Sequence, residues 1–332
     1  MNFLQPQNPI FIVGCPRSGT TVLTVQLGRH PDIVTTPETS FFELITHFWP
    51  IVLRKQPVSN KNVDKIFKIP RFRKLNLNLN EVKQLLDNTD RSHRSFFCVL
   101  MECFRNQSGK SFWCEKTPRH LYHVKKILEF FPNAKIIHIV RDGRDVANSL
   151  RKVYWRESNL LTQAHEWVLN AKIGLALNKR LPKERFLTIF YEDLLTTPED
   201  VLSVTCKFIG VKYYPFLFSN DKKDNFGDTC VTNWTGNEKD ISWLRKTKEK
   251  PDVKRIAAWK TECTQDEIVR LNYIMGVWLK HWKYEQTEVQ LEKRERFFFQ
   301  LQSNNTRFLR YLLDFLTRYA PRFRTKKYLK YL

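Results

Sequence analysis

The cysteine pattern is the first of several absences in this sequence. Seven cysteines are present, but they form no Cys-x-x-Cys pair and no spacing typical of zinc ligands. An odd number without such a framework indicates reduced thiols, so we expect a cytoplasmic protein that holds no metal. The seven are Cys15, Cys98, Cys103, Cys114, Cys206, Cys230 and Cys263.

Segments that would direct the chain into a membrane are also missing. The first residues, "MNFLQPQNPIFIVG", have no basic region followed by a long apolar run, so we expect no signal peptide. No apolar run elsewhere reaches the roughly 18 residues of a membrane span. A protein held in a membrane by a spanning helix is therefore not predicted.

Acidic residues are scarce relative to basic ones. The chain has 34 Asp and Glu against 56 Lys and Arg, which gives a formal charge of +22. Part of this charge will be solvated surface, but such a balance favours an anionic partner. The candidates are nucleic acid, an acidic membrane surface, or a phosphorylated or sulfated small molecule.

Apolar runs followed by helical patterns predict an α/β domain. With 42% hydrophobic residues, the 332-residue chain can build a substantial core. Short buried strands are expected at residues 9–13, 134–140 and 185–194, and strand–loop–helix repetition predicts a central parallel sheet. Helical periodicity covers residues 162–179 and 264–284. Thr264 and Glu267 fit a capping box at the start of the second helix.

Two segments differ from this pattern. Residues 43–112 are polar and interrupted by prolines, so we expect an insertion of short helices and loops between the first and second strands, near the acceptor cleft. Residues 292–332 hold eleven Lys or Arg against three Glu or Asp, with an apolar helical face. We therefore divide the chain into a domain of residues 1–285 and a basic amphipathic tail of residues 286–332. The tail could dock on the domain, on a second subunit or on an anionic bilayer.

The stretch "GCPRSGTT" has the layout of a phosphate-binding loop. Gly14 and Gly19 are separated by four residues, after a predicted strand and before a predicted helix. The lysine that a nucleotide triphosphatase carries after the second glycine is absent, because Thr20 occupies that position. The backbone N–H groups of residues 17–21 can converge on an anion, and Arg17 adds a fork of donors suited to phosphate or sulfate.

A second anion site is predicted where the strand at 134–140 ends. Arg141 follows this strand directly, and Ser149 lies eight residues later. We expect Asp145 to cap a helix beginning near Val146, with Ser149 about one turn into it. Arg141 and Ser149 would then face the crevice beside the first loop. Two separate anion sites indicate a nucleotide with phosphates in two places.

These motifs resemble those of sulfotransferases that use 3′-phosphoadenosine 5′-phosphosulfate (PAPS). "PRSGTT" resembles their 5′-phosphosulfate loop, and "IVRDGRDVANSLRK" resembles their 3′-phosphate motif. "HPDIVTTPETSFF" and "WCEKTPRH" make the chain most similar to bacterial-type members related to tyrosylprotein sulfotransferases. The resemblance spans about residues 9–284. It implies a P-loop-like three-layer α/β/α fold and sulfuryl transfer from PAPS, giving the desulfated product PAP, without a dedicated metal.

The resemblance also implies roles for individual residues. Glu38 is the candidate general base, although it could instead cap the following helix or pair with Arg17. Lys116 would reach the transferring group, unless it is a surface lysine, and Arg17 would neutralise charge on the leaving group. One set of residues is expected to bind the nucleotide. Its members are Arg17, Ser18, Gly19, Thr20, Thr21, Arg141, Ser149 and Tyr191, although Tyr191 could instead pack under the sheet.

Some questions stay open at the level of sequence. A loop near residues 248–255 should close over the nucleotide, but Lys248, Lys250, Lys254 and Arg255 all compete for that contact. The acceptor is expected to be a carbohydrate, a glycolipid or another small molecule, with a peptide tyrosine also open and no specific nucleic acid. Rival interpretations are a P-loop kinase or NTPase with a degenerate loop, a polyanion-binding module, and a sulfotransferase fold that only binds.

Overall fold

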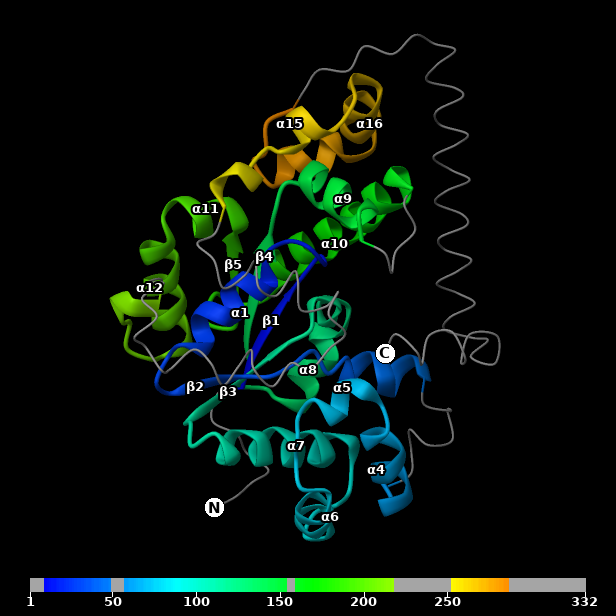
Figure 1. The fold of residues 1–332 in the computed structure, drawn as a ribbon, viewed down its shortest axis with the longest axis vertical. Coiled ribbons are helices and arrows are strands. Elements are labelled where there is room, and N and C mark those ends of the chain that lie inside the picture. The colour runs from blue at the N-terminus through cyan, green and yellow to red at the C-terminus, as the bar shows by residue number, and fades with distance from the viewer. Residues whose placement is uncertain (1–8, 49–56, 154–158, 218–251, 287–332) are drawn as a thin grey trace.

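A parallel sheet of five strands forms the centre of the protein. The computed structural model describes residues 9–48, 57–153, 159–217 and 252–286 (Figure 1). The strand order is β2-β3-β1-β4-β5, and every neighbouring pair is parallel. The strands are β1 (Ile10–Gly14), β2 (Ile33–Thr35), β3 (Phe112–Lys116), β4 (Lys135–Val140) and β5 (Phe186–Phe190). The predicted α/β class with a central parallel sheet is confirmed.

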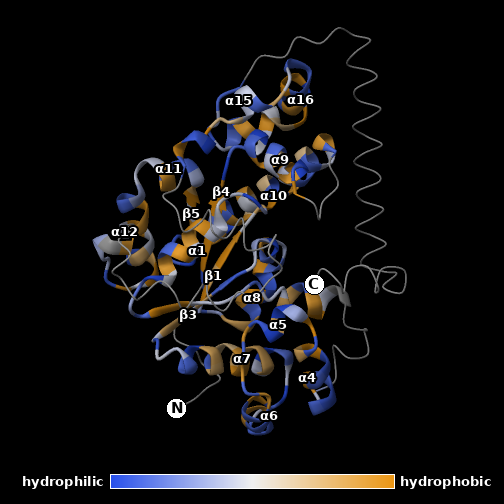
Figure 2. Cartoon of the chain, viewed as in Figure 1, coloured by the Kyte–Doolittle hydropathy of each residue, from blue (hydrophilic) through white to orange (hydrophobic). Residues whose placement is uncertain are grey.

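Strands β1 and β4 are apolar because both of their faces are buried. On β1, Ile10 and Ile12 belong to the hydrophobic cluster on one face of the sheet, and Phe11 and Val13 belong to the cluster on the other. A half-exposed strand alternates polar and apolar residues, whereas a central parallel strand reads as a continuous apolar run. Figure 2 shows β1 and β4 as mostly hydrophobic. This explains why the sequence predicted these two strands with nearly their observed bounds.

Helices cover both faces of the sheet. One face is covered by α1, α11 and α12, the other mainly by α2, α7 and α8, while α9, α10 and α16 share a third cluster. The described α-helices are α1 (Thr20–Gly28), α2 (Phe41–Glu43), α4 (Asn60–Phe67), α5 (Pro70–Arg73), α6 (Leu79–Asp87), α7 (His93–Gln107), α8 (Val124–Phe130), α9 (Gly143–Arg151), α10 (Leu160–Arg180), α11 (Tyr191–Thr196), α12 (Pro198–Ile209), α15 (Trp259–Glu262) and α16 (Gln265–His281). Shorter helical segments are Leu44–Phe48, Pro118–His123, Pro215–Leu217 and Val253–Arg255.

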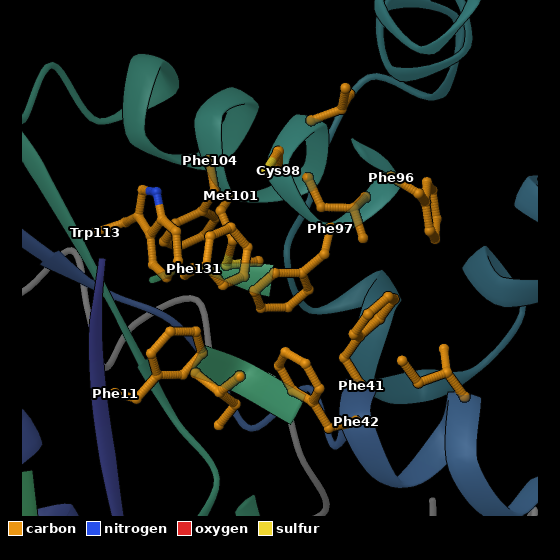
Figure 3. Close-up of a cluster of buried hydrophobic side chains, with 14 of the residues drawn as sticks. Phe11, Phe41, Phe42, Phe96, Phe97, Cys98, Met101, Phe104, Trp113 and Phe131 are labelled. Carbon is orange, nitrogen blue, oxygen red and sulfur yellow. The ribbon is translucent and has the colours of Figure 1, made fainter. Parts of the chain in front are cut away.

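The described residues of the insertion at 43–112, which are 43–48 and 57–112, are more helical and more deeply buried than its composition suggested. Helices α4–α7 gather at one end of the molecule, and α7 is a 15-residue helix rather than a short one (Figure 1). Phe97 of α7 packs among aromatic rings from the sheet and from α2, including Phe11 at 6.2 Å and Phe41 at 4.6 Å between ring centroids (Figure 3). This aromatic cluster fastens the insertion to the sheet.

Several predicted boundaries were wrong. Strands β2 and β3 were missed, so the strand expected second is the fourth in chain order. The strand predicted at 185–194 ends at Phe190, because Tyr191 begins α11, whose first turn carries Glu192 and Asp193. Acidic side chains in a first turn are stabilised by the helix dipole. The two long helices and the Thr264–Glu267 capping box are confirmed.

The basic tail is not part of this description. Residues 287–332 lie outside the described residues, so its docking or membrane contact stays a prediction. Among the helices of the described part of the chain, none combines the length and apolar character needed to cross a membrane.

Two helical glycines allow a matched test of the packing of α10 against the sheet. A Cβ atom at Gly174 would overlap the buried ring of His138 on β4, whereas a Cβ atom at Gly276 on α16 would meet open space. We expect Gly174→Ala to lower the free energy of unfolding by about 1–3 kcal/mol through overpacking. Gly276→Ala should raise it by about 0.5–1 kcal/mol because alanine favours a helix. Chemical denaturation of both variants checks this, and equal effects of the two substitutions would contradict the packing.

Candidate active site

A predicted site residue lies at or just after the carboxyl end of each of the five described strands. In the order β1 to β5 these are Arg17, Glu38, Lys116, Arg141 and Tyr191. Lys116 is the last residue of β3, and Arg141 and Tyr191 directly follow β4 and β5. Carboxyl ends of parallel strands meet at one edge of the sheet, where ligands bind in α/β proteins. The parallel topology therefore gathers residues that lie far apart in the sequence.

The loop after β1 adopts a conformation that requires glycine. Gly19 has φ 95°, in the left-handed region, and a Cβ atom there would overlap the ring of Tyr191. Helix α1 begins at the next residue, Thr20, so its N-terminus is directed at the loop. Arg17 also has a positive φ of 72°, which is strained for a residue with a side chain. Ser18 Oγ is buried and has no hydrogen-bond partner among the described residues.

The structure brings together the two anion-binding motifs that the sequence predicted. Arg17 Nε donates a hydrogen bond to Ser149 Oγ at 3.1 Å, and Arg141 Nη1 donates to the carbonyl of Arg17 at 3.2 Å. Ser149 lies nearly two turns into α9 rather than one. The guanidinium of Arg141 lies 4.4 Å from the centre of the Tyr191 ring, so Tyr191 is beside this cluster.

Cationic side chains gather at this part of the carboxyl edge of the sheet. Burial, together with the charges of Arg141 and Arg255, lowers the pKa of Arg17, although a guanidinium stays protonated. Arg141 is only 8% exposed, and its Nε has no hydrogen-bond partner among the described residues. Asp145 lies 3.6 Å from Arg141, and burial raises the pKa of this carboxyl. An anion bound here would meet a buried, positively charged and incompletely hydrogen-bonded surface.

Asp145 does not cap α9, contrary to our prediction. The cap is Asp142, whose side chain accepts a hydrogen bond from the N–H of Arg144 at 2.9 Å. Asp145 lies inside the first turn and instead accepts from the backbone N–H groups of Ala257 at 3.0 Å and Trp259 at 2.9 Å. Its carboxylate therefore fastens a segment more than 100 residues away to the start of α9.

That segment supplies a further cation to the site. Arg141 Nη2 donates to the carbonyl of Arg255 at 2.8 Å, and the charge of Arg255 acts on both Arg17 and Tyr191. Lys248 and Lys250 lie outside the described residues. Among the basic residues of this segment that the structure describes, Arg255 is therefore our candidate for the nucleotide contact.

Glu38 and Lys116 form an ion pair at the carboxyl end of β3. Lys116 Nζ donates to Glu38 Oε1 at 2.6 Å and to Thr21 Oγ1 at 3.3 Å, so it links the carboxylate to the loop. The side chain of Lys116 is fully buried, while that of Glu38 is 33% exposed. Arg71 Nη1 reaches Glu38 Oε2 at 3.4 Å from helix α5. Lys116 is thus not a surface lysine.

The charge state of Glu38 follows from these neighbours. Burial on its own would raise the pKa of Glu38, but the charges of Lys116 and Arg71 and their hydrogen bonds outweigh it and hold that pKa below its usual value. Glu38 does not occupy the N-cap position of α2, which is Ser40. Its ion pairs are with Lys116 and Arg71, and the charges of Glu38 and Arg17 also act on each other. An ionised, partly exposed carboxylate beside a buried ammonium can accept a proton.

Sequence reasoning missed Arg71. It lies on a four-residue helix inside the insertion, 33 residues from Glu38, and no motif connects the two positions. Only the packing of α5 near the carboxyl end of β3 brings its guanidinium to the carboxylate. A contact of this kind has no local sequence signal.

Comparisons with known proteins agree with this geometry. A family model described as "Sulfotransferase family" matches residues 9–215, more than half of the chain. "Protein-tyrosine sulfotransferase" of Drosophila melanogaster is 27% identical over 212 residues, which cover 61% of this chain and 38% of that protein. "Protein-tyrosine sulfotransferase 2" of Gallus gallus is 25% identical over 209 residues, covering 61% and 51%. The chain therefore spans between about a third and a half of the length of these relatives.

A solved structure supports the fold independently. The sulfotransferase domain of the Synechococcus PCC 7002 olefin synthase matches with a TM-score of 0.60 at 20% identity, covering 86% of this chain and 98% of that one. Likeness at this identity concerns the fold, which is the P-loop-like α/β architecture expected from the sequence. Together with the match over residues 9–215, these findings show that the chain belongs to the sulfotransferase family.

Proposed function

We propose that the protein transfers a sulfuryl group from PAPS to a hydroxyl or amine of an acceptor and releases PAP. The observation that carries this proposal is the juxtaposition of two groups of residues at one sheet edge. Arg17, Arg141 and Ser149 form a cation-rich anion site, and the Glu38–Lys116 ion pair is joined to the same loop through Thr21. Membership of the sulfotransferase family supports the reaction class. It does not favour the kinase or NTPase alternative.

The buried polar groups fit a nucleotide with two separate anionic ends. The N–H groups of residues 17–21 and the hydroxyl of Ser18 would hold the 5′-phosphosulfate, while Arg141 and Ser149 would hold the 3′-phosphate. Ser18 Oγ and Arg141 Nε lack hydrogen-bond partners among the described residues, which is expected of atoms that bind a ligand. Arg255 would add a further positive charge. PAPS supplies an activated sulfuryl group and needs no dedicated metal in this scheme.

The residues around Glu38 account for the transfer step. The acceptor oxygen forms a bond to sulfur while the bond from sulfur to the 5′-phosphate oxygen breaks, and the acceptor proton passes to Glu38. Arg17 and Lys116 stabilise the negative charge that develops on the leaving phosphate and the sulfuryl oxygens. Lys116 is suited to this because it already lies between the loop and Glu38.

The acceptor, the location and the membrane contact belong to the same proposal. We place the acceptor among carbohydrates, glycolipids and other small molecules. A peptide tyrosine, which the sequence already left open, is the class that the names of the relatives support. We propose a cytoplasmic protein whose basic tail can contact an anionic membrane surface.

Calorimetric titration with PAP tests the nucleotide site. We expect wild-type protein to bind PAP in preference to ATP with Mg²⁺. Arg141→Ala should weaken PAP binding by roughly 10- to 100-fold, since it removes charge-assisted hydrogen bonds. Arg185→Ala is the matched control, because Arg185 precedes β5 at the amino edge of the sheet and donates to Asn133. Preference for ATP with Mg²⁺, or equal PAP binding in both variants, would contradict the proposal.

Replacement of Glu38 tests the base. Glu38→Gln should lower the rate of sulfate transfer from labelled PAPS by roughly 10²- to 10⁴-fold, the usual contribution of a general base. PAP affinity should stay unchanged, because the residues assigned to the nucleotide are intact. Glu81→Gln on the exposed face of α6 serves as the control. A near-normal transfer rate in Glu38→Gln would remove Glu38 as the base.

The pH dependence of transfer tests the contact between Arg71 and Glu38. Lys116, Arg71 and Arg17 are the charged groups that act on Glu38, and the base must be ionised to accept a proton. Removing one cation raises the pKa of Glu38, so Arg71→Gln should shift the acidic limb of kcat/KM to higher pH. Arg73→Gln, on the same short helix, should leave that limb in place. Identical pH profiles for the two variants would contradict the contact.

A further inference from the structure

A fully buried carboxylate lies directly behind the candidate catalytic pair. Glu115 precedes Lys116 on β3, and both Glu115 and its partner His120 are 0% exposed. Successive side chains of a strand point to opposite faces, so Glu115 points away from Glu38 while Lys116 points toward it. A buried charge is costly unless it is fully hydrogen-bonded. The transfer reaction gives Glu115 no role, so its presence needs another explanation.

Glu115 accepts hydrogen bonds from the residue that follows Glu38 and from residues that follow Lys116. Its Oε1 accepts from Thr39 Oγ1 at 2.8 Å, from the N–H of Thr39 at 3.3 Å and from Thr117 Oγ1 at 2.6 Å. Its Oε2 lies 2.9 Å from His120 Nδ1. Burial would raise the pKa of Glu115, but His120 and these hydrogen bonds outweigh it and lower that pKa. Glu115 is therefore an ionised carboxylate that accepts several hydrogen bonds.

The partners of Glu115 extend the network along the backbone. Thr117 Oγ1 accepts from the N–H of Ser40 at 3.2 Å, and Thr39 Oγ1 accepts from the N–H of Phe41 at 3.2 Å. His120 Nε2 accepts from the N–H of Phe42 at 3.3 Å, which leaves the ring proton on Nδ1, facing Glu115. Four consecutive backbone N–H groups thus end on this network.

The segment held in this way is strained. Ser40 has φ 50°, a left-handed conformation that costs a residue with a side chain about 1–3 kcal/mol and persists only where the surroundings enforce it. Glu38 lies two residues before this turn. Without the bonds of Glu115, Thr117 and His120, the turn would relax, and the direction of the Glu38 side chain would change with it.

We propose that Glu115, supported by His120, is a positioning residue that sets the geometry of the Glu38–Lys116 pair. The carboxylate of Glu115 binds Thr39, the residue after Glu38, and Glu115 directly precedes Lys116 on β3. Glu115 therefore couples the two backbone segments that carry Glu38 and Lys116. This inference rests on the proposed function, because it assigns Glu38 as the base. Glu115 touches no reacting atom and acts through the segment at residues 39–42.

Two buried threonines close to Glu38 in the sequence provide a matched test. Thr39→Val removes the hydroxyl that links Glu115 to this segment while keeping the shape of the side chain. We expect it to lower kcat for sulfate transfer from labelled PAPS by about tenfold or more, as a misplaced catalytic group does. Thr36→Val is the control, since Thr36 is equally buried and its Oγ1 has no hydrogen-bond partner among the described residues. Thr39→Ser, which restores the hydroxyl, should rescue kcat.

Further measurements separate positioning from loss of structure. PAP affinity should match that of wild type in all three threonine variants, because the residues assigned to the nucleotide follow β1, β4 and β5 rather than β2 or β3. The amide protons of residues 39–42 should exchange faster in Thr39→Val than in Thr36→Val. Glu115→Gln should lower kcat more than Thr39→Val does. If the Glu115→Gln protein fails to fold, the threonine variants still distinguish positioning from loss of structure. Equal kcat in Thr39→Val and Thr36→Val would overturn the inference, whereas absence of PAP binding and transfer in wild type would overturn the proposed function.

Discussion

Two arginines at adjacent strand ends, one buried and one partly buried, impose the main constraint on this protein. Arg17 and Arg141 come from the loops after β1 and β4, and hydrogen bonds bring them together with Ser149 at the carboxyl edge of the sheet. Asp145 supplies one carboxylate near Arg141, while Arg255 adds another positive charge. Like charges held close together and partly buried repel each other and lose hydration, which is why we propose an anion as the occupant of this site.

The sheet and the insertion contribute different parts of the site. The segments that follow β1, β4 and β5 form the proposed anion site, with Gly19 fitted against the ring of Tyr191. The insertion brings Arg71 to Glu38 from the other side, and the aromatic cluster around Phe97 fastens that insertion to the sheet. The buried network of Glu115 lies between the two parts. The proposed catalytic pair of Glu38 and Lys116 is therefore held by a strand on one side and by the insertion on the other.

An element or contact could be predicted from the sequence where its signal lies in neighbouring residues. Strands β1 and β4 were predictable because burial of both faces leaves an uninterrupted apolar run, and the loop after β1 carries its glycines within one short stretch. Strand β2 has three residues, and β3 contains Glu115 and Lys116, so neither shows an apolar run. Asp145 was misassigned because its partners lie 112 and 114 residues away. Such contacts depend on tertiary packing and leave no local pattern.

A crystal structure of the protein with PAP tests the central claim most directly. The account predicts the 5′-phosphate in the loop of residues 17–21, and the 3′-phosphate in hydrogen-bond contact with Arg141 and Ser149. Glu38 and Lys116 should remain paired beside the 5′-phosphate, on the side where PAPS would carry its sulfuryl group. A nucleotide bound away from the carboxyl edge of the sheet, or a 3′-phosphate that touches neither Arg141 nor Ser149, would contradict it.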